Sequence, residues 1–327
     1  MKPMIFLAKP IPEVGMKLLQ AAGEVKTGIA RGTLFPDDLA TRAGGCTGML
    51  VTPAEPISEA ILQKLPTLKG ISNFGVGYNH IDVAACTRRG IGVANTPDVL
   101  TAATAEVAWA LILACARRVV EGDRLMRSGK WAGWEPMDFL ASPVVGKTLG
   151  IVGAGRIGSC VAKMAAGFDM PIRYTARSPK PEIEMHLGAR RVDLPNLLAN
   201  ADFVSLHVPL STETRHLIGE RELAMMKRSA FIINTARGPL IDEQALVNAV
   251  RDKRIAGCGL DVYENEPSLT PGLIDFPNVV LLPHVGSGTL ETREKMAVMA
   301  ADNLVAMLQG HRPPHCVNPE VYDQPRI

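Results

Sequence analysis

The chain lacks cysteine pairs. Its six cysteines are far apart, and none belongs to a Cys-x-x-Cys pair, so neither a zinc site nor a redox motif is indicated. We interpret them as reduced, buried thiols and expect a cytoplasmic protein without a metal site, because reduced thiols are typical of reducing compartments. The cysteines are Cys46, Cys86, Cys115, Cys160, Cys258 and Cys316.

Long hydrophobic runs are also missing. The N-terminus has an apolar run only from Met4 to Ala8, which is shorter than the central region of a signal peptide. The longest nearly apolar stretch, Ala102 to Ala116, is interrupted by Glu106 and is shorter than the ~18 residues that a membrane-spanning helix needs. We therefore expect a soluble protein that is neither secreted nor bound to a membrane.

The chain has no large excess of positive or negative charge. The 35 basic and 33 acidic residues give a formal charge of +2, and the lysines and arginines are scattered along the chain. Nucleic-acid binding needs clustered cations, so we expect no nucleic-acid partner. The 327 residues, of which 47% are hydrophobic, are enough for one large or two ordinary domains, and they exclude the disordered and fibrous classes.

Short β-rich runs alternate with amphipathic runs, which indicates βαβ units and parallel sheets. The strands expected in the first part of the chain are 4–8, 48–52, 70–74 and 91–95, with helices near 14–21 and 58–65. One long helix is then predicted from about residue 101 to 128, followed by Gly129. The strands expected after it are 148–152, 172–175, 203–208, 231–234, 257–262 and 279–282. A last helix, near 290–308, is expected to return to the first domain.

The pattern predicts the α/β class with two doubly wound parallel-sheet domains. Residues 1–98 and 290–327 would form a flavodoxin-like substrate domain, and residues 99–289 would form a Rossmann cofactor domain. The interdomain cleft is expected to hold the reaction and to close around it.

A glycine-rich turn follows the strand expected at 148–152. Gly153, Gly155 and Gly158 form a GxGxxG motif between this strand and the next helical pattern. The first glycine permits the tight turn, the second lets the backbone approach a pyrophosphate, and the third lets the helix pack on the strand. The motif and its context predict a dinucleotide site.

The cofactor's ribose is expected to lie at the end of the next strand. Thr175 stands 22 residues after Gly153, where an NAD enzyme would carry an acid, and Arg177 and Ser178 follow it. A guanidinium and a hydroxyl suit a 2′-phosphate, which a carboxylate would repel. We therefore predict NADP(H) as the preferred cofactor, with NAD(H) possible.

Three polar segments follow later strands of the series. They bring Arg237, the carboxylate of Glu266 and His284 to the edge of the sheet where α/β folds assemble their sites. Reduction of a 2-oxo acid needs a fixed cation, a proton donor and a source of hydride, and these residues with NADPH supply all three.

With these motifs, the chain resembles the D-isomer-specific 2-hydroxyacid dehydrogenase family over essentially its whole length, and within it the glyoxylate/hydroxypyruvate reductases. The matching stretches are Asn73–Asp82, Gly153–Gly158, Asn234–Gly238, Gly259–Pro267 and Pro283–Ser287.

The resemblance implies roles for these residues. Arg237 would bind the substrate carboxylate and polarise the carbonyl, His284 would donate the proton, and Glu266 would hydrogen-bond the imidazole and favour its charged form. Val76 and Gly77 would bind the substrate through their backbone N–H groups, although the glycines there also suit an ordinary turn. The remaining residues expected to contact the cofactor are Thr104, Arg156, Ile157, His207, Pro209, Thr214, Thr235, Asp261 and Gly286, in addition to His284.

Several alternatives stay open. Thr104 is equally suited to capping a helix and Asp261 to capping a loop, and the Trp131/Trp134 loop either caps a pocket or packs at an interface. The apolar face of the long helix and the resemblance both indicate a homodimer. Besides glyoxylate or hydroxypyruvate reduction, the family allows a dehydrogenase for phosphite or a larger D-2-hydroxy acid, or a cofactor-sensing binding protein such as the transcriptional corepressors of this fold.

Overall fold

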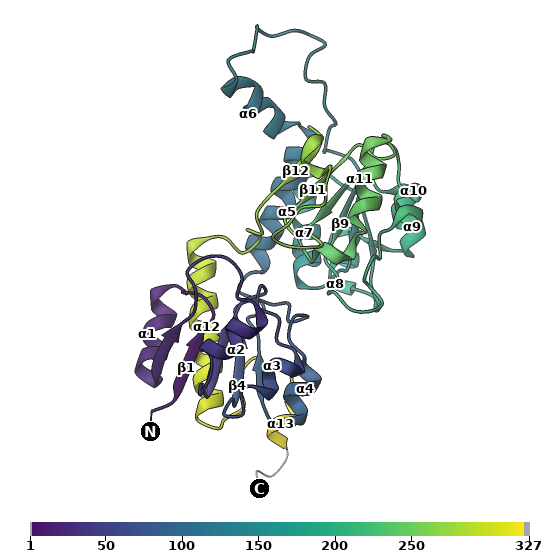
Figure 1. Cartoon of the computed structure of the whole chain (residues 1–327). Coiled ribbons are helices and arrows are strands. Elements are labelled where there is room, and N and C mark those ends of the chain that lie inside the picture. The colour runs from purple at the N-terminus through teal and green to yellow at the C-terminus, as the bar shows by residue number, and fades with distance from the viewer. Residues whose placement is uncertain (1, 324–327) are drawn as a thin grey trace. The chain divides into compact units, whose positions relative to one another are not determined.

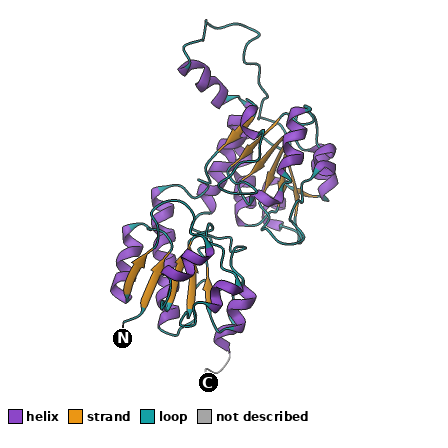
Figure 2. Ribbon diagram, in the orientation of Figure 1, coloured by secondary structure: helices purple, strands orange, loops and turns teal. Residues whose placement is uncertain are grey.

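The computed structural model describes residues 2–323, which form two compact units, each built on a parallel sheet (Figures 1 and 2). The first unit contains the residues up to Leu100 together with those from Ser287 onward, and the second unit runs from Thr101 to Gly286. These limits lie two and three residues away from the domain limits expected at 98 and 290. The predicted fold class is confirmed.

The first unit has a five-stranded sheet in the order β2-β1-β3-β4-β5, which is the flavodoxin-like order. Its strands are β1 (Met4–Leu7), β2 (Glu24–Thr27), β3 (Gly48–Val51), β4 (Gly70–Asn73) and β5 (Gly92–Ala94). Its helices are α1 (Glu13–Ala22), α2 (Pro36–Arg42), α3 (Glu59–Gln63), α4 (Val83–Arg88), α12 (Leu290–Leu308) and α13 (Glu320–Asp323). As expected, α12 returns to this unit, where it packs against α1, β3 and β4.

The second unit has a seven-stranded sheet in the order β12-β11-β10-β9-β6-β7-β8. Its strands are β6 (Leu149–Val152), β7 (Ile172–Thr175), β8 (Arg190–Arg191), β9 (Phe203–Leu206), β10 (Phe231–Asn234), β11 (Gly257–Leu260) and β12 (Val279–Leu281). Its helices are α5 (Thr101–Ala116), α6 (Val119–Arg127), α7 (Arg156–Ala165), α8 (Pro181–Leu187), α9 (Leu194–Asn200), α10 (Glu220–Met225) and α11 (Glu243–Arg251).

Both faces of the second sheet are covered, which explains why every residue of its central strands β6, β9, β10 and β11 is buried and most of these residues are apolar. Successive side chains of a strand point to opposite faces. Ile232 therefore belongs to the apolar cluster that contains Leu197 and Leu246, whereas Ile233 belongs to the cluster that contains Ile112 and Val161.

Two strands are present that the sequence pattern does not predict. Both β2 and β8 lie at the edge of their sheet, and their side chains are mostly exposed. An edge strand with exposed side chains needs no apolar run, so the pattern used to find buried strands is absent from both.

The prediction of a single long helix at 101–128 is wrong. The structure has two helices, α5 and α6, because Arg118 adopts a left-handed conformation with a φ of 53°. The Arg118 guanidinium lies 4.6 Å from the centre of the Phe139 ring and donates hydrogen bonds to Glu121 and to the Leu140 carbonyl. Two of these contacts are with residues some twenty positions later, and they hold the Arg118 side chain at the break.

Within residues 2–323, no helix combines the length and the apolar character that crossing a lipid bilayer requires.

Candidate active site

The glycine-rich turn connects β6 to α7. Gly153 has a φ of 97°, and a Cβ on Gly158 would lie only 2.2 Å from the Gly153 carbonyl oxygen, so α7 packs on the turn at a distance that only glycine allows. Gly155 caps α7, and a Cβ there would meet no atom within 4 Å. The first N–H groups of a helix have no partner inside it, so this open space beside Arg156 and Ile157 fits a pyrophosphate.

The loop after β7 carries the residues expected at the ribose. The Thr175 carbonyl accepts a hydrogen bond from Gly153 N at 2.9 Å, which joins this loop to the glycine-rich turn. Arg177 and Ser178 are exposed, and Lys180 Nζ lies 3.5 Å from Ser178 Oγ. The loop from 175 to 180 contains no carboxylate. These residues fit a 2′-phosphate group.

Arg191 is a residue that the sequence reasoning missed. Its guanidinium donates to the Ala176 carbonyl at 2.9 and 3.1 Å and to the Arg177 carbonyl at 3.0 Å. Because Arg191 lies on the unpredicted edge strand β8, nothing in the sequence pattern placed it beside this loop.

The loop after β9 contains His207, Pro209 and Thr214. His207 N donates to the Val152 carbonyl at 2.7 Å, so His207 lies beside the end of β6. Thr214 Oγ1 donates to the Pro209 carbonyl at 2.7 Å, which fixes the shape of this loop. Burial lowers the pKa of His207 to about 3, so its ring, which lies 2.8 Å from Ser205 Oγ, is neutral near pH 7.

We expect His207 to make the stability of the protein pH-dependent. An unfolded histidine titrates near 6.5, so between pH ~6.5 and 3 the unfolded chain binds a proton that the folded chain does not. The free energy of unfolding therefore falls on acidification, by up to about 1.4 kcal/mol per pH unit for this group. The midpoint of thermal unfolding should fall less steeply between pH 6.5 and 4.5 in His207→Asn than in wild type. Equal slopes would contradict this prediction, and His186→Asn, which changes an exposed histidine, is the control.

Arg237 follows β10 in a loop whose shape is fixed by Asn234. Asn234 donates to the Arg237 carbonyl at 2.8 Å and accepts from Ala236 N at 3.0 Å. A Cβ on the next residue, Gly238, would lie 1.8 Å from the Tyr263 carbonyl carbon, so only glycine lets the two loops approach this closely. Burial lowers the pKa of Arg237, and the Glu266 charge opposes this shift.

Thr235 is buried beside Arg237. Its hydroxyl makes no hydrogen bond to any residue in the described part of the chain. A buried hydroxyl without a partner is costly, so a bound ligand is a fitting partner for it.

Glu266 and His284 form a hydrogen-bonded pair, with 2.9 Å between Glu266 Oε2 and His284 Nδ1. The other carboxylate oxygen, Oε1, accepts a hydrogen bond from Tyr263 N at 2.9 Å. Burial would raise the pKa of Glu266, but the hydrogen bond to His284 and the charges of His284 and Arg237 hold it below the ordinary glutamate value. Because Nδ1 is engaged, Nε2 is the nitrogen of His284 that can exchange a proton with a ligand.

Asp261 holds the backbone around His284, which has a φ of 55°. Its Oδ1 accepts from Val285 N and its Oδ2 accepts from Gly286 N, both at 2.7 Å. A left-handed conformation costs a non-glycine residue about 1–3 kcal/mol, and these hydrogen bonds offset that cost. Burial raises the pKa of Asp261 against the effect of these hydrogen bonds. Of the two expected roles, the structure shows the loop cap.

Thr104 lies in the first turn of α5, three residues after the helix begins at Thr101, so it does not cap this helix. A Cβ added to Gly286 would lie 3.4 Å from Thr104 Cγ2 and 3.1 Å from Asp261 Oδ2. The structure therefore brings Thr104, Asp261 and Gly286 together.

A turn shaped by two asparagine side chains lies at the end of β4 in the first unit. Asn73 donates to the carbonyls of Gly75 and Gly77 at 2.9 and 3.0 Å, and Asn95 donates to the Val76 carbonyl at 2.7 Å. Among the described residues, the backbone N–H groups of Val76 and Gly77 make no hydrogen bond. Successive N–H groups of this kind form a concave site for an anion.

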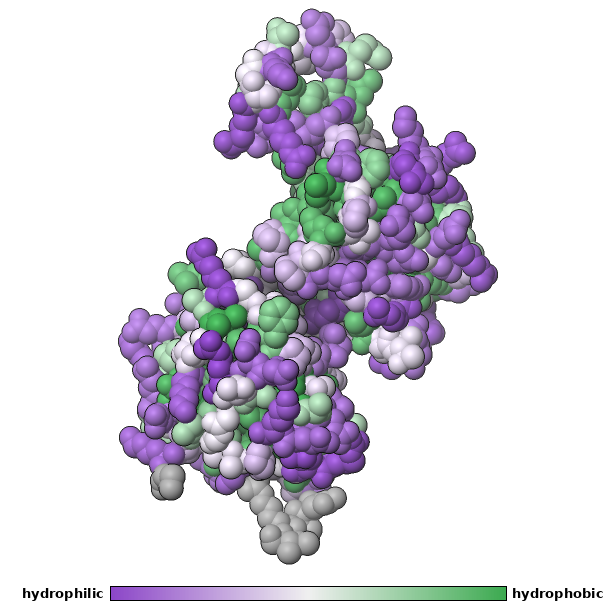
Figure 3. Space-filling view, viewed as in Figure 1, coloured by the Kyte–Doolittle hydropathy of each residue, from purple (hydrophilic) through white to green (hydrophobic). Residues whose placement is uncertain are grey.

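Trp131 and Trp134 lie on the loop after α6, which extends away from the sheet of its unit (Figure 1). Both indoles are exposed, at 53% and 80%. Figure 3 shows apolar side chains among hydrophilic ones on this segment. The large exposed apolar residues of this α6 arm, residues 119–145, are Val119, Met126, Trp131, Trp134, Met137, Phe139, Leu140 and Val145.

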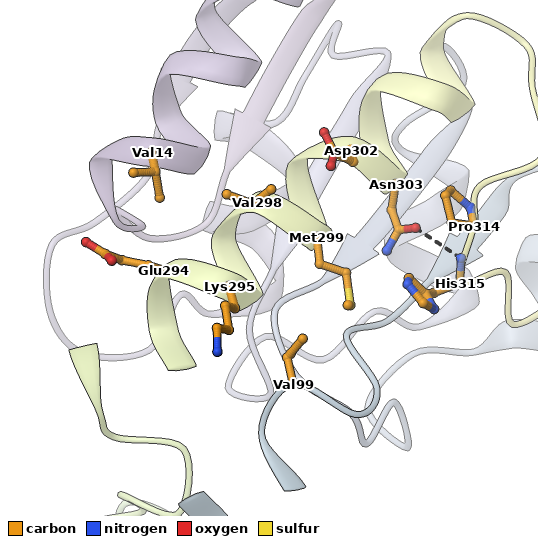
Figure 4. Close-up of a pocket in the computed structure, with 10 residues that line it drawn as sticks. All are labelled: Val14, Val99, Glu294, Lys295, Val298, Met299, Asp302, Asn303, Pro314 and His315. Atoms are coloured by element: carbon orange, nitrogen blue, oxygen red, sulfur yellow. Dashed lines mark hydrogen bonds between the residues drawn. The ribbon is translucent and has the colours of Figure 1, made fainter. Parts of the chain in front are cut away.

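A separate hollow of about 490 Å³ lies in the first unit, and α12 provides most of its lining (Figure 4). The Asn303 amide accepts a hydrogen bond from His315 N at 3.1 Å within it. It contains none of the predicted site residues. The lining residues are Val14, Val99, Glu294, Lys295, Val298, Met299, Asp302, Asn303, Pro314 and His315.

Known proteins resemble the chain over nearly its whole length. Residues 109–286 match the model of the D-isomer specific 2-hydroxyacid dehydrogenase, NAD binding domain. A glyoxylate reductase of Thermococcus litoralis is 47% identical, and the alignment covers 98% of both chains.

Two solved structures are similar as well. The first is a glyoxylate reductase from Paecilomyes thermophila, with a TM-score of 0.85, 35% identity, and coverage of 97% of this chain and 98% of that one. The second is an NADPH-dependent glyoxylate/hydroxypyruvate reductase from Sinorhizobium meliloti in complex with NADP and malonate, with a TM-score of 0.88, 32% identity and full coverage of both chains.

The glycine-rich turn, Arg237, Glu266 and His284 all lie within the segment that matches the family model, and the relatives extend this match to the remainder of the chain. The resemblance inferred from the motifs is confirmed, and the chain belongs to the D-isomer-specific 2-hydroxyacid dehydrogenase family.

Proposed function

We propose that the protein reduces glyoxylate to glycolate and hydroxypyruvate to D-glycerate, with NADPH as the preferred cofactor and His284 as the proton donor. The Glu266–His284 pair carries this proposal, because one imidazole nitrogen is held at 2.9 Å by a carboxylate while the other can protonate a carbonyl oxygen. Relatives named glyoxylate reductase support the choice of substrate.

Each residue then has a defined task. Arg237 binds the substrate carboxylate and polarises the carbonyl, and the N–H groups of Val76 and Gly77 also donate to the carboxylate. When bound, the nicotinamide supplies the hydride that reduces the carbonyl carbon. His284 gives its Nε2 proton to the carbonyl oxygen, and the Glu266 carboxylate stabilises the imidazolium before that transfer. In the reverse direction the neutral imidazole accepts the hydroxyl proton.

The second unit is the cofactor domain in this proposal, and the first is the substrate domain. The open N-terminus of α7 takes the pyrophosphate, and Thr235 Oγ1 gains a partner when the cofactor binds. Arg177 and Ser178 take the 2′-phosphate, which no neighbouring carboxylate of that loop repels. The NADP bound to the Sinorhizobium meliloti reductase supports this preference.

The cofactor preference depends on Arg177 in this proposal. We expect Arg177→Ala to raise the KM for NADPH by about 10-fold or more, because a charge-assisted contact is worth roughly 1.5–3 kcal/mol, and to change the KM for NADH little. Steady-state kinetics with both cofactors measures the two values. Arg173→Ala, which changes an arginine earlier on β7, is the control. An equal change in the KM for both cofactors would show that Arg177 does not distinguish them by binding the 2′-phosphate.

The proposed reaction is tested by following NADPH, and separately NADH, at 340 nm with glyoxylate, hydroxypyruvate and pyruvate. Rapid oxidation of NADPH with the first two substrates is the expected result. Faster turnover with NADH would refute the cofactor preference. No turnover with any of the three, with NADPH binding retained, would refute the proposed substrate class.

We also propose a homodimer, formed through the α6 arm, and a cytoplasmic location, which the six free thiols support. An apolar surface of this kind on a projecting segment is typical of an interaction site. Light scattering coupled to size-exclusion chromatography is expected to give twice the 35.1 kDa mass of one chain. A monomer across the micromolar range would contradict the dimer.

A further inference from the structure

Glu266 lies in a tight turn, in which Ser268 N donates to the Asn265 carbonyl at 2.8 Å. The segment from Tyr263 to Thr270 contains no helix or strand, and yet it holds the Glu266 carboxylate at hydrogen-bond distance from His284. Within the segment, Tyr263 N holds one oxygen of Glu266, and the Tyr263 hydroxyl donates to the Leu282 carbonyl at 2.7 Å.

Glu243, the first residue of α11, holds both sides of this segment. Its side chain is almost fully buried, with 2% of the residue exposed. Glu243 Oε1 accepts a hydrogen bond from Glu264 N at 2.7 Å, and Oε2 accepts one from Thr270 Oγ1 at 2.5 Å. The two contacts lie two residues before and four residues after Glu266, so a single carboxylate fixes both flanks of the loop that carries it.

The Glu264 side chain adds a second attachment. Its Oε1 lies 2.5 Å from His216 Nε2 and 3.7 Å from the Arg215 guanidinium. His216 N in turn donates to the carbonyl of Pro239, two residues after Arg237. The loop that carries Glu266 is thus tied to α11 and to the loop that carries Arg237.

We infer that Glu243 is a positioning residue for the Glu266–His284 pair. Its carboxylate accepts its two hydrogen bonds from Glu264 and Thr270, and it acts by fixing the chain on both sides of Glu266. This inference rests on the proposed role of His284 as proton donor with Glu266 as its partner. Burying a carboxylate costs free energy, which hydrogen bonds to both of its oxygens offset. Both of these hydrogen bonds come from the loop that carries Glu266.

Two substitutions of Glu243 distinguish the loss of its hydrogen bonds from a change in side-chain volume. Glu243→Leu keeps the approximate volume but has no acceptor, so both flanks of the loop lose their attachment. Glu243→Gln is the conservative variant, because its amide oxygen can accept from Glu264 N and its amide nitrogen can donate to Thr270 Oγ1. The matched control is Asp202→Leu, since Asp202 also joins two segments of this unit, through Thr148 N and Lys227 Nζ, both at 2.9 Å.

Kinetics as a function of pH give the first readout. We expect Glu243→Leu to lower kcat for reduction by about 10-fold or more, with the KM of the 2-oxo acid changed less than about 3-fold, and Glu243→Gln to restore most of kcat. The pH dependence of reduction should change in Glu243→Leu in the same direction as in Glu266→Gln, because both variants disturb the hydrogen bond between Glu266 and His284. In Asp202→Leu the pH dependence should stay as in wild type.

The double variant Glu243→Leu/Glu266→Gln tests whether the two residues act together. If Glu243 acts through Glu266, the double variant loses little more activity than Glu266→Gln alone. Additive losses would overturn the inference, as would an unchanged pH profile in a folded Glu243→Leu protein.

A second readout does not depend on turnover. In protein labelled with ¹⁵N-histidine, the His284 signals are those absent from the spectrum of His284→Asn, and the chemical shift of Nδ1 reports the hydrogen bond to Glu266. This chemical shift should change in Glu243→Leu, as in Glu266→Gln, and return to the wild-type value in Glu243→Gln. An unchanged Nδ1 signal in Glu243→Leu would overturn the inference about Glu243. A changed signal in a protein that reduces no 2-oxo acid would uphold it and refute the proposed function alone.

Discussion

Replacing His284 with asparagine should lower kcat for glyoxylate reduction by about 10²–10⁴-fold, which is the usual contribution of a general acid. Asparagine still donates a hydrogen bond to Glu266 but has no group at the place of Nε2, so the carbonyl oxygen receives no proton from the protein. The dissociation constant for NADPH should change far less than kcat, because His284 is only one of the expected cofactor contacts and the glycine-rich turn and the loop after β7 are untouched. Stopped-flow or steady-state kinetics give kcat, and fluorescence titration gives NADPH affinity.

The control for this variant is His186→Asn, which removes an exposed histidine of α8 and should keep wild-type kinetics. A folded His284→Asn protein with wild-type kcat would refute the assignment of the proton donor. A large loss in both kcat and NADPH affinity would point instead to collapse of the loop that Asp261 holds.

Arg237→Ala should lower kcat/KM by about 10²–10³-fold, the range seen when one preorganised donor is removed from a reacting site. Asn234 holds the Arg237 backbone through the Arg237 carbonyl, and the Arg237 guanidinium donates to the Ala236 carbonyl at 2.7 Å. Both the KM of the 2-oxo acid and kcat should change, because the same side chain binds the carboxylate and polarises the carbonyl.

Arg237→Lys should recover only part of this loss, since an ammonium is a point charge and lacks the fork that matches a carboxylate. Arg251→Ala, which removes an exposed arginine of α11, is the control. If Arg237→Ala bound and reduced glyoxylate as well as wild type, another cation would have to hold the substrate.

The sequence predicted the parts of the fold that consist of buried strands. Runs such as 203–206 and 231–234 are apolar because both faces of the sheet are covered, and polar residues directly after such runs are at the edge where sites form. The glycine-rich turn was identifiable because each glycine has a separate steric reason, which the positive φ of Gly153 and the close approach at Gly158 show.

The parts that the sequence did not predict depend on contacts between distant residues. At the helix break, Arg118 contacts Phe139 and Leu140, and a helix pattern carries no information about such distant contacts. Arg191 lies beside residue 177 only because a short polar strand forms at the sheet edge. Glu243 looks like an ordinary acidic residue at the start of a helix, and its function depends on a loop twenty residues later.

The order of the strands has a consequence for how the site is assembled. Strands β10, β11 and β12 are neighbours both along the chain and across the sheet. Arg237, Glu266 and His284 therefore come from one uninterrupted stretch of sequence, and the loops that carry them start from adjacent strands. Insertions elsewhere in the chain can lengthen loops or change what a pocket accepts without changing the separation of these groups. In the proposed reaction, the three reacting groups thus belong to a single segment of the sequence, and residues outside that segment can differ with the acid that is bound.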